Sequence, residues 1–477
     1  MELVAKKIDY TRLQSTFQKQ KERSLLSRKE PVHERKKRLG NLSDWIFSNR
    51  DRIKHAIHQD FGKPLLEVDT TEIYPIITEI RYTLNHLDDW AKPANVDAPL
   101  PYLGTRSEIR YEPKGVCLII APWNFPFNLC IGPLISCLAA GNTAVLKPSE
   151  LTPFTSSLLK GMIAEIFEEE LVTVVEGGPE VSTHLLSLPF DHIFFTGSPA
   201  VGKIVMKAAA DHLASVTLEL GGKSPAIIDA SANLKDSAKR VAFGKFFNNG
   251  QTCIAPDYVL VEEKVREPFL QELKKWVAAL FGQDGVVDET SPSYSRIVNA
   301  RNFQRLNALL QDAIQKGAAL ELSGPVNAES RFIHPMILSN VSMNARMMEE
   351  EIFGPILPII PFTSTAEVLR IINDRPKPLA LYIFTTDRRF RETILSETSA
   401  GGVCINDCIM QFTHPGLPFG GVNHSGMGKS HGRFGFLAFS NEKPVLRQKR
   451  GFAAPYLLYP PYKPEMKRII DILLRWF

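Results

Sequence analysis

The chain has 477 residues, of which 44 % are hydrophobic and 23 % charged, a composition typical of globular proteins. It is too long for one compact core, so we expect two or three domains. The formal charge of +4 is concentrated in residues 441–477, which carry eight Lys and Arg against three Asp and Glu. The rest of the chain has no basic excess, which argues against nucleic acid as a partner.

Cysteine usage and the N-terminus indicate the compartment. The six cysteines lack the spacing of a disulfide framework, and the first residues show no leader of charged, apolar and small residues. We therefore expect a cytoplasmic protein. Cys404 and Cys408 have no second cysteine pair or histidine pair beside them, so we expect no metal site.

The N-terminal region up to residue 94 predicts amphipathic helices, with apolar residues at helical spacing between Ile73 and Leu84. Prolines at 93–101 end this region, and the alternating stretch 107–112 predicts an arm or hairpin. The next 32 residues, 115–146, are uncharged and long enough to span a bilayer. Prolines and asparagines interrupt them, so we expect the buried centre of an α/β sheet instead.

Short β runs alternate with helices from Gly115 onward. The first set of expected strands lies at residues 116–121, 143–146, 172–175, 192–195, 216–218 and 226–228. After Asp229, a second set lies at residues 258–261, 332–338, 356–361, 380–385 and 402–405. Strands that alternate with helices form parallel, doubly wound sheets. The predicted fold class is therefore α/β, with two α/β domains.

The segment 197–203 has the glycine and lysine spacing of a phosphate loop. Ile204 stands where such a loop needs Ser or Thr to hold Mg²⁺, which argues against an NTPase. The spacing also differs from Gly-x-Gly-x-x-Gly. What remains is a strand that turns through Gly197 and Ser198 into a helix beginning near Val201, whose free N–H groups favour a pyrophosphate. A plain βα turn without a ligand is the alternative.

Cys253 differs from the other cysteines. It ends the polar, glycine-containing turn 249–253, which we expect to be mobile. The other thiols lie in apolar stretches, where a thiol behaves as a small buried hydrophobe: Cys117, Cys130, Cys137, Cys404 and Cys408. Glu219 stands beside the Gly221-Gly222 bend. A reactive thiol with a carboxylate nearby is suited to covalent catalysis followed by hydrolysis.

Two further loops follow expected strands, where open α/β sheets bind ligands. Asn124 lies between Pro122 and Pro126, which stiffen the loop and pre-position the amide as a hydrogen-bond donor. Lys147 and Glu150 place a cation and a carboxylate just past the next strand.

These segments, taken together, resemble the aldehyde dehydrogenase superfamily in order and spacing from about residue 20 to 450. The motifs that carry the resemblance are Pro122-Trp123-Asn124-Phe125-Pro126, Lys147-Pro148-Ser149-Glu150, Phe195-Thr196-Gly197-Ser198, Leu218-Glu219-Leu220-Gly221-Gly222-Lys223, Gly250-Gln251-Thr252-Cys253, Glu351-Ile352-Phe353-Gly354-Pro355 and Pro418-Phe419-Gly420-Gly421. The segment 253–258 and the short N-terminal helical region resemble the class 3 branch, which acts on medium- and long-chain or aromatic aldehydes. Asn423 departs from the pattern, because relatives usually have glycine there.

The resemblance implies oxidation of an aldehyde to its carboxylic acid, with NAD⁺, or NADP⁺, as hydride acceptor. It implies that Cys253 is the nucleophile, that Asn124 and the Cys253 N–H stabilise the oxyanion, and that Glu219 is the general base. Glu351 is a rival for the base role. The implied cofactor-binding residues are Trp123, Lys147, Glu150, Gly197, Ser198, Gly202, Leu220, Glu351 and Phe353.

The resemblance also implies a domain layout. A Rossmann-like NAD(P)-binding domain comprises 1–96 and 114–219, and a catalytic domain comprises 220–418. A small β oligomerisation arm comprises 97–113 and 438–449, through which the family forms a homodimer. Residues 450–477 form a tail.

Competing enzyme classes are less consistent with the motifs. A CoA-acylating dehydrogenase shares the cysteine but has no use for a water-activating base such as Glu219. A catalytically silent relative is expected to have lost Cys253 or Asn124, and both are present.

The tail predicts a short amphipathic helix after the prolines at 460–464. Its apolar face comprises Met466, Ile469, Ile470, Leu473, Leu474 and Phe477. About 12 residues are too few to span a bilayer, which takes ~20. Three roles stay open: docking on the protein's own or its dimer partner's surface, a gate over the aldehyde tunnel as in the fatty aldehyde dehydrogenases that the chain resembles, and peripheral contact with anionic lipid.

Overall fold

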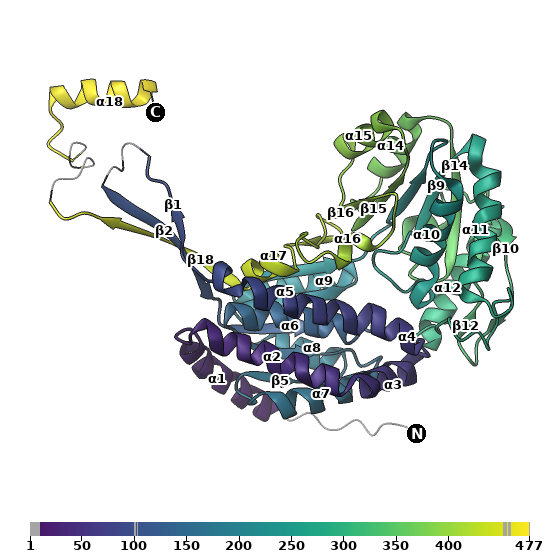
Figure 1. The fold of residues 1–477 in the computed structure, drawn as a ribbon, viewed down its shortest axis with the longest axis horizontal. Helices are drawn as coiled ribbons and strands as arrows, with labels where there is room; N and C mark the ends of the chain where they lie inside the picture. The colour runs from purple at the N-terminus through teal and green to yellow at the C-terminus, as the bar shows by residue number, and fades with distance from the viewer. Residues whose placement is uncertain (1–9, 100–101, 103, 452–455, 457–458, 477) are drawn as a thin grey trace.

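Two large sheets and a small antiparallel sheet organise the chain in the computed structural model, which describes residues 10–99, 102, 104–451, 456 and 459–476. The large sheets belong to two α/β halves that lie side by side, and the small sheet projects from the first half (Figure 1). The predicted α/β fold class with parallel sheets is confirmed.

The first sheet places a crevice at the ends of its central strands. In spatial order its strands are β17 (Gly426–Met427), β7 (Ser215–Leu220), β6 (His192–Gly197), β3 (Val116–Ile120), β4 (Thr143–Lys147) and β5 (Val172–Val174). Neighbours are parallel except β17, which runs antiparallel to β7. The chain proceeds outward from β3 to β5 and then returns to β6 on the other side of β3. Open α/β sheets bind ligands at such a reversal.

Both faces of the first sheet are buried, which explains its nearly continuous apolar strands. Cys117 and Ile119 of β3 pack into one core, whereas Val116 and Leu118 pack into the other. The uncharged stretch 115–146 is thus buried protein core, as predicted. The helices of this half are α1 (Tyr10–Ser27), α2 (Val32–Ser48), α3 (Arg50–Phe61), α4 (Leu65–Val68), the π-helix η1 (Asp69–Ile73), α5 (Tyr74–Trp90), α6 (Asn128–Ala140), α7 (Pro153–Ile166), α8 (Pro179–Leu186), α9 (Pro199–Asp211) and α17 (Gly432–Ala438).

The second half is built on a seven-stranded sheet. In spatial order its strands are β10 (Ala319–Leu322), β13 (Met336–Ser339), β14 (Ile356–Phe362), β9 (Tyr258–Glu262), β8 (Pro225–Ile228), β15 (Ala380–Phe384) and β16 (Gly402–Ile405). Neighbouring strands are parallel except β10, which runs antiparallel to β13. A separate two-stranded ladder joins β11 (Val326–Asn327) to β12 (Phe332–Ile333). The helices are α10 (Leu234–Phe246), the 3₁₀ helices η3 (Phe247–Gly250) and η4 (Glu263–Val265), α11 (Arg266–Phe281), α12 (Ala300–Gln315), α13 (Arg346–Glu349), α14 (Thr365–Asn373), α15 (Arg388–Glu397) and α16 (Met410–Thr413).

Two strand predictions were wrong. The run 226–228 was grouped with the first set of strands, but β8 pairs with β9 and β15 in the second sheet. Only residues 221–224 separate β7 from β8, and a parallel crossover within one sheet needs a dozen or more residues. The run 332–338 forms two strands, β12 and β13, because Pro335 lacks the N–H that a continuous ladder needs.

The small sheet is antiparallel, with β2 (Thr105–Pro113) between β1 (Ala94–Val96) and β18 (Ser440–Gln448). β1 lies inside the range 1–96 that was assigned to the cofactor domain, so the sheet begins earlier than residue 97. Beyond it, α18 (Pro464–Trp476) lies away from both halves (Figure 1).

Helix α18 does not dock on this chain's own body. Ile469, Ile472 and Leu474 are exposed at 38 %, 59 % and 80 %. The side chain of Leu473 and residue Phe477, both assigned to the apolar face, lie outside the described residues. None of the helices in the described ranges is both long and apolar enough to cross a membrane.

Candidate active site

A cavity of about 570 Å³ opens between the two halves at the carboxyl ends of β3, β6 and β7. Most of the predicted site residues line it: Trp123, Asn124, Gly197, Ser198, Glu219, Leu220, Cys253, Glu351 and Phe353. Lys147, Glu150 and Gly202 are not part of this lining. The topology therefore brings together motifs that are up to 230 residues apart in the sequence.

Cys253 follows a buried turn rather than the mobile one that the sequence predicted. Residues Asn248, Asn249 and Gln251 are fully buried. Three successive residues have positive φ: 49° at Asn248, 56° at Asn249 and 71° at Gly250. A Cβ at Gly250 would overlap the carbonyl of Gly354, so glycine lets this turn pack directly against the Phe353-Gly354-Pro355 turn.

Hydrogen bonds tie the Cys253 turn to the Asn124 loop in both directions. The Asn124 side-chain amide donates to the carbonyl oxygen of Gln251 over 3.0 Å. The Asn248 side-chain amide donates to the carbonyl oxygen of Asn124 over 2.9 Å. Asn124 is 3 % exposed, so its amide has little competition from solvent. The second hydrogen of the amide is available to a substrate oxygen.

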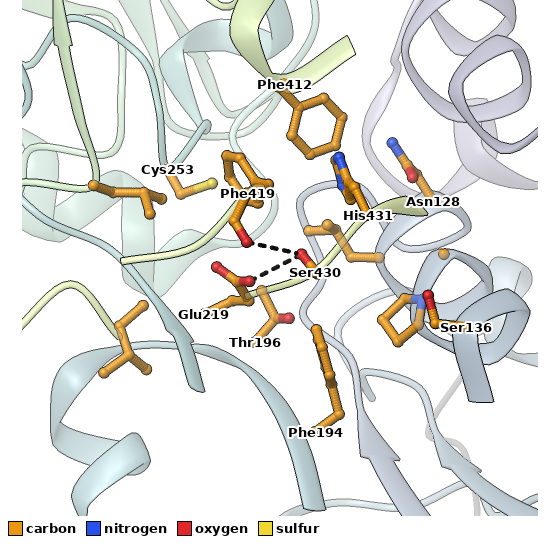
Figure 2. Close-up of a pocket in the computed structure, with 15 residues that line it drawn as sticks. Asn128, Ser136, Phe194, Thr196, Glu219, Cys253, Phe412, Phe419, Ser430 and His431 are labelled. Atoms are coloured by element: carbon orange, nitrogen blue, oxygen red, sulfur yellow. Dashed lines mark hydrogen bonds between the residues drawn. The ribbon is translucent and has the colours of Figure 1, made fainter. Parts of the chain in front are cut away.

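Glu219 and Cys253 also line a smaller chamber that adjoins the large cavity (Figure 2). The Ser430 hydroxyl donates to Glu219 Oε1 over 3.0 Å and lies 3.3 Å from the carbonyl oxygen of Phe419. Glu219 Oε2 is buried and has no hydrogen-bond partner among the described residues. Burial raises the pKa of Glu219 to about 8, although Ser430 and the charge of Lys429 oppose the shift. A carboxyl group with this pKa can accept a proton near neutral pH.

The thiol of Cys253 shares this low-dielectric environment. Burial, together with the negative charges of Glu351 and Glu219, raises its pKa well above the ordinary value. The resting thiol is therefore protonated at neutral pH, and it must lose its proton during attack rather than before it.

Glu351 also lines the large cavity. Burial raises the pKa of its carboxyl group to about 8, and the charge of Asp257 adds to the shift. The carboxylate packs so closely on Gly221 that a Cβ there would overlap it. Phe353 stands nearby and meets the Trp123 ring edge-on, with ring centroids 5.3 Å apart.

The remaining predicted residues surround the helix end that faces the cavity. Ser198 caps α9, which begins at Pro199 rather than near Val201 because proline is favoured at the first helical position. Gly202 lets α9 close onto Leu220, since a Cβ there would overlap that side chain. Lys147 and Glu150 form an ion pair at 3.0 Å beside the same strand ends.

These features fit a dinucleotide. Gly197, Ser198 and Ala200 line the cavity at the N-terminus of α9, and the positive end of the helix dipole there favours a pyrophosphate. The cation and carboxylate of the Lys147–Glu150 pair suit ribose hydroxyls on one side. The Glu351 carboxylate offers the same chemistry on the other.

Several residues of the site were missed by the sequence reasoning. Arg305 donates to the carbonyl oxygens of Glu351 (3.2 Å) and Ile352 (2.6 Å) and so holds that loop. Ser430 contacts Glu219 across 211 positions of sequence, and no local motif signals such a contact. Other residues that line the two cavities and were missed include Asn128, Lys377, Phe412, His424 and His431.

Asn423, which departs from the family pattern, preserves the turn geometry. Its φ is +56°, a conformation that asparagine tolerates better than most residues. Its side-chain oxygen accepts a hydrogen bond from Lys377 Nζ at 3.0 Å. The departure therefore anchors Lys377 at the rim of the large cavity.

Comparison with known proteins agrees with this geometry. The model of the aldehyde dehydrogenase family matches residues 6–445. The chain belongs to this family. It is 44 % identical to 4,4'-diaponeurosporen-aldehyde dehydrogenase of Staphylococcus aureus, over 91 % of this chain and 93 % of that protein. It is 42 % identical to mouse aldehyde dehydrogenase family 3 member A2, over 91 % and 88 % of the two chains.

A solved structure extends the likeness to three dimensions. The substrate-bound state of Staphylococcus aureus AldH superposes with a TM-score of 0.92 at 42 % identity, covering 97 % of this chain and 99 % of that one. The class 3 resemblance is thereby shown, and the chain is an aldehyde dehydrogenase of a family that uses NAD(P).

The contact between Gly221 and Glu351 makes a prediction. Gly221→Ala adds a methyl group that displaces the Glu351 carboxylate, and we expect NAD⁺ affinity to fall about tenfold, the effect of one lost hydrogen bond to a charged group. Titration calorimetry with NAD⁺ measures it. Gly161→Ala is the matched control, because a Cβ at Gly161 in α7 meets open space. Equal NAD⁺ affinity in the two variants would show that Glu351 does not contact the cofactor.

Proposed function

We propose that this enzyme oxidises medium- or long-chain aliphatic or aromatic aldehydes to carboxylic acids, with NAD⁺, or alternatively NADP⁺, as hydride acceptor. The observation that supports it most is the convergence of Cys253, Asn124, Glu219 and Glu351 on one cavity. A thiol, an amide donor and a buried carboxylate with a pKa of about 8 are the groups that thioester chemistry requires.

As Cys253 Sγ adds to the aldehyde carbonyl, the thiol proton passes to solvent in the large cavity, and the adduct is a tetrahedral thiohemiacetal oxyanion. The free hydrogen of the Asn124 amide and the Cys253 N–H stabilise its oxyanion, and one such donor contributes about 3–4 kcal/mol. A nicotinamide held beside Glu351 and Phe353 would supply the hydride acceptor, and loss of the hydride would leave a thioester on Cys253. Glu219 then takes a proton from the water that cleaves the thioester. Glu351 is the alternative base.

The cofactor's adenosine half lies along β4 and α9 in this proposal. Gly197 and Ser198 bind the pyrophosphate, and Lys147 with Glu150 binds the ribose hydroxyls. The Glu150 carboxylate repels a 2′-phosphate, which favours NAD⁺, and a rotated side chain admits NADP⁺. Glu351 binds the nicotinamide ribose, and Trp123, Leu220 and Phe353 pack around that half. Gly202 contributes by letting α9 approach β7.

The acyl chain occupies an aromatic channel in this proposal. The chamber beside Cys253 is lined by Phe194, Phe412 and Phe419, which suits an apolar chain. A second cavity, towards Pro75 and Ile76 of α5, shares Phe412 and other lining residues with the chamber. The relative named for 4,4'-diaponeurosporen-aldehyde supports an aldehyde as the substrate.

The arm and the tail support a homodimer as the third part of the proposal. The outer edges of β1 and β18 have no partner strand among the described residues, and an unpaired edge is a ready pairing site. The exposed apolar face of α18 is then covered by the second subunit, which accounts for its distance from this chain's own body. Contact with anionic lipid and gating of the tunnel are the alternatives.

The order of the chemical steps makes a prediction. Because the base acts after the redox step, Glu219→Gln should give a burst of about one NADH per active site and then a slow phase about 100-fold below the native rate. Rapid-mixing absorbance at 340 nm with decanal and NAD⁺ measures both phases. Cys253→Ala, the control, should give neither phase.

The pH dependence follows from the same carboxyl group. Glu219 acts as base when deprotonated, so hydrolysis-limited turnover should rise with pH through about 8, and Glu219→Gln should lose this rise. If Glu351→Gln shows the burst and Glu219→Gln does not, the two carboxylates exchange roles.

Truncation after Tyr459 separates the three roles of the tail. Docking on the second subunit predicts a lower melting temperature with an unchanged KM for decanal and propanal. A KM that changes for decanal but not for propanal would instead assign α18 as a gate. Loss of binding to phosphatidylserine vesicles, at unchanged melting temperature, would assign a lipid contact.

A further inference from the structure

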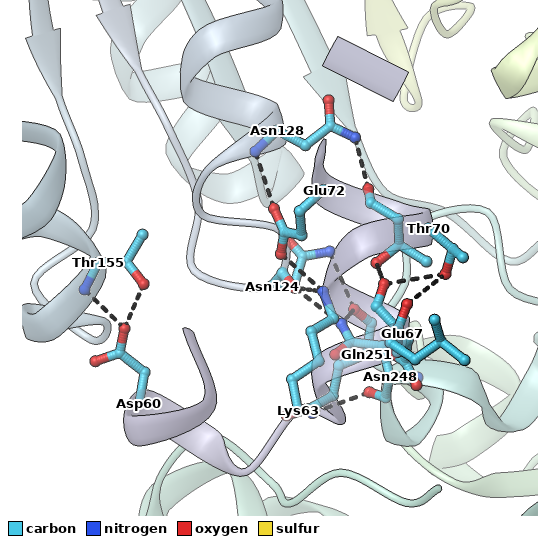
Figure 3. Close-up of polar contacts among 12 residues, drawn as sticks. Asp60, Lys63, Glu67, Thr70, Glu72, Asn124, Asn128, Thr155, Asn248 and Gln251 are labelled. Carbon is cyan, nitrogen blue, oxygen red and sulfur yellow. Dashed lines mark hydrogen bonds and ion pairs between the residues drawn. The ribbon is translucent and has the colours of Figure 1, made fainter. Parts of the chain in front are cut away.

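A buried ionic cluster lies directly behind the Asn124 loop and the Cys253 turn (Figure 3). Lys63 follows α3, and Glu72 lies in the π-helix η1. Both side chains are fully buried, and Lys63 Nζ lies 2.7 Å from Glu72 Oε1. Lys63 Nζ also stands 3.9 Å from the ring centroid of Phe125, the neighbour of Asn124. A second carboxylate, that of the partly exposed Glu67, lies in α4.

Each charged group of the cluster holds backbone near the reacting atoms. Lys63 Nζ donates a long hydrogen bond, 3.4 Å, to the carbonyl oxygen of Asn124. Glu67 Oε1 accepts from the backbone N–H of Asn248 at 2.9 Å. Glu72 Oε2 accepts from the backbone N–H of Asn128 at 2.9 Å, at the start of α6. The cluster therefore forms hydrogen bonds with three backbone groups: the carbonyl of Asn124 and the N–H groups of Asn248 and Asn128.

The two loops that carry Asn124 and Cys253 need such a fixed support. Neither residue lies on a strand or regular helix, and their hydrogen bonds otherwise join one loop to the other. An oxyanion donor is effective when it is held in place before the reaction, and a displacement of about 1 Å can cost ~100-fold in rate. A buried ion pair is a poor source of stability, because apolar residues of similar size often serve as well.

We propose that Lys63, Glu72 and Glu67 are positioning residues, which set the Asn124 amide and the Cys253 turn relative to each other through the Asn124 carbonyl and Asn248. The cluster touches neither substrate nor cofactor and acts through groups that do. The inference rests on the proposed role of Asn124 as oxyanion donor. The positive charge of Lys63 stabilises the ionised forms of both carboxylates, because it opposes the rise in pKa that burial causes at Glu67 and at Glu72.

A double-mutant cycle with Asn124→Ala tests this. Lys63→Met/Glu72→Gln removes the ion pair as a unit, and Glu67, which loses the cation that opposes the rise in its pKa to about 7, can then take up a proton. We expect kcat/KM for decanal to fall by about 10- to 100-fold while the Kd of NAD⁺ stays within about twofold. In the Asn124→Ala background, the same pair of substitutions should lower kcat/KM by less than about threefold, because the side-chain amide that the cluster positions is gone.

Asp60→Asn is the matched control. Asp60 is a buried carboxylate at the end of α3, close to Lys63 in sequence, but it accepts from Thr155 and Phe154 at the start of α7 (Figure 3). It should lower the melting temperature without changing kcat/KM for decanal by more than about twofold.

The outcomes separate the inference from the proposed function. If the charge-neutral pair lowers kcat/KM by the same factor with and without Asn124, or has no effect in the native background, the positioning role is wrong. If Asn124→Ala itself leaves kcat/KM unchanged, the proposed oxyanion role fails instead.

A second variant can be used if Lys63→Met/Glu72→Gln does not fold. Asn248→Gly suits the positive φ of that position and removes one donor to the Asn124 carbonyl. The same cycle then applies, and full additivity with Asn124→Ala would overturn the inference.

Discussion

The burial of the turn that precedes Cys253 is the constraint on which the rest of the site depends. Three consecutive residues adopt the left-handed conformation, which is unfavourable unless surrounding contacts enforce it. Gly250 meets the backbone of Gly354, and the Asn248 amide meets the Asn124 loop. The first contact joins two segments of the second half that are distant in sequence, and the second contact joins the two halves. The turn is therefore formed by tertiary packing, and the thiol is delivered to a fixed place between the two sheets.

The same burial controls the charges in the site. The pKa of Glu219 and that of Glu351 are both raised to about 8, and the thiol pKa is raised further by the two carboxylates. Full ionisation of all three groups at once is unfavourable in such a small apolar volume. A neutral resting site that releases one proton at a time suits a reaction in which the thiol attacks first and water attacks later.

The sequence predicted the strands well because buried parallel strands are short apolar runs with little ambiguity. It failed at 226–228, where the run itself was recognised but its sheet was not. To assign this strand to a sheet, one must consider the connection between β7 and β8, which is too short for a parallel crossover within one sheet. The local sequence pattern does not contain this information. It also failed to split 332–338, where Pro335 was the available signal.

The sequence located those residues of the candidate site whose motifs lie at the ends of predicted strands. Asn124, Ser198 and Glu219 lie where carboxyl ends of strands meet, so topology alone brings them together. Ser430, Arg305 and Lys63 act through contacts between distant segments, and nothing in their local sequence marks them. The polar residues of 249–253 suggested a turn in solvent, whereas the turn is buried and its side-chain amides donate hydrogen bonds to backbone carbonyls.

The account's central claim is that the substrate becomes covalently bound to Cys253. The most direct test is mass spectrometry of Glu219→Gln, mixed with decanal and NAD⁺, quenched in acid during the burst and digested. The account predicts that the peptide containing Cys253 carries the added mass of a decanoyl group, in proportion to the NADH formed. An unmodified Cys253 peptide at full burst, or acylation of another cysteine, would contradict it.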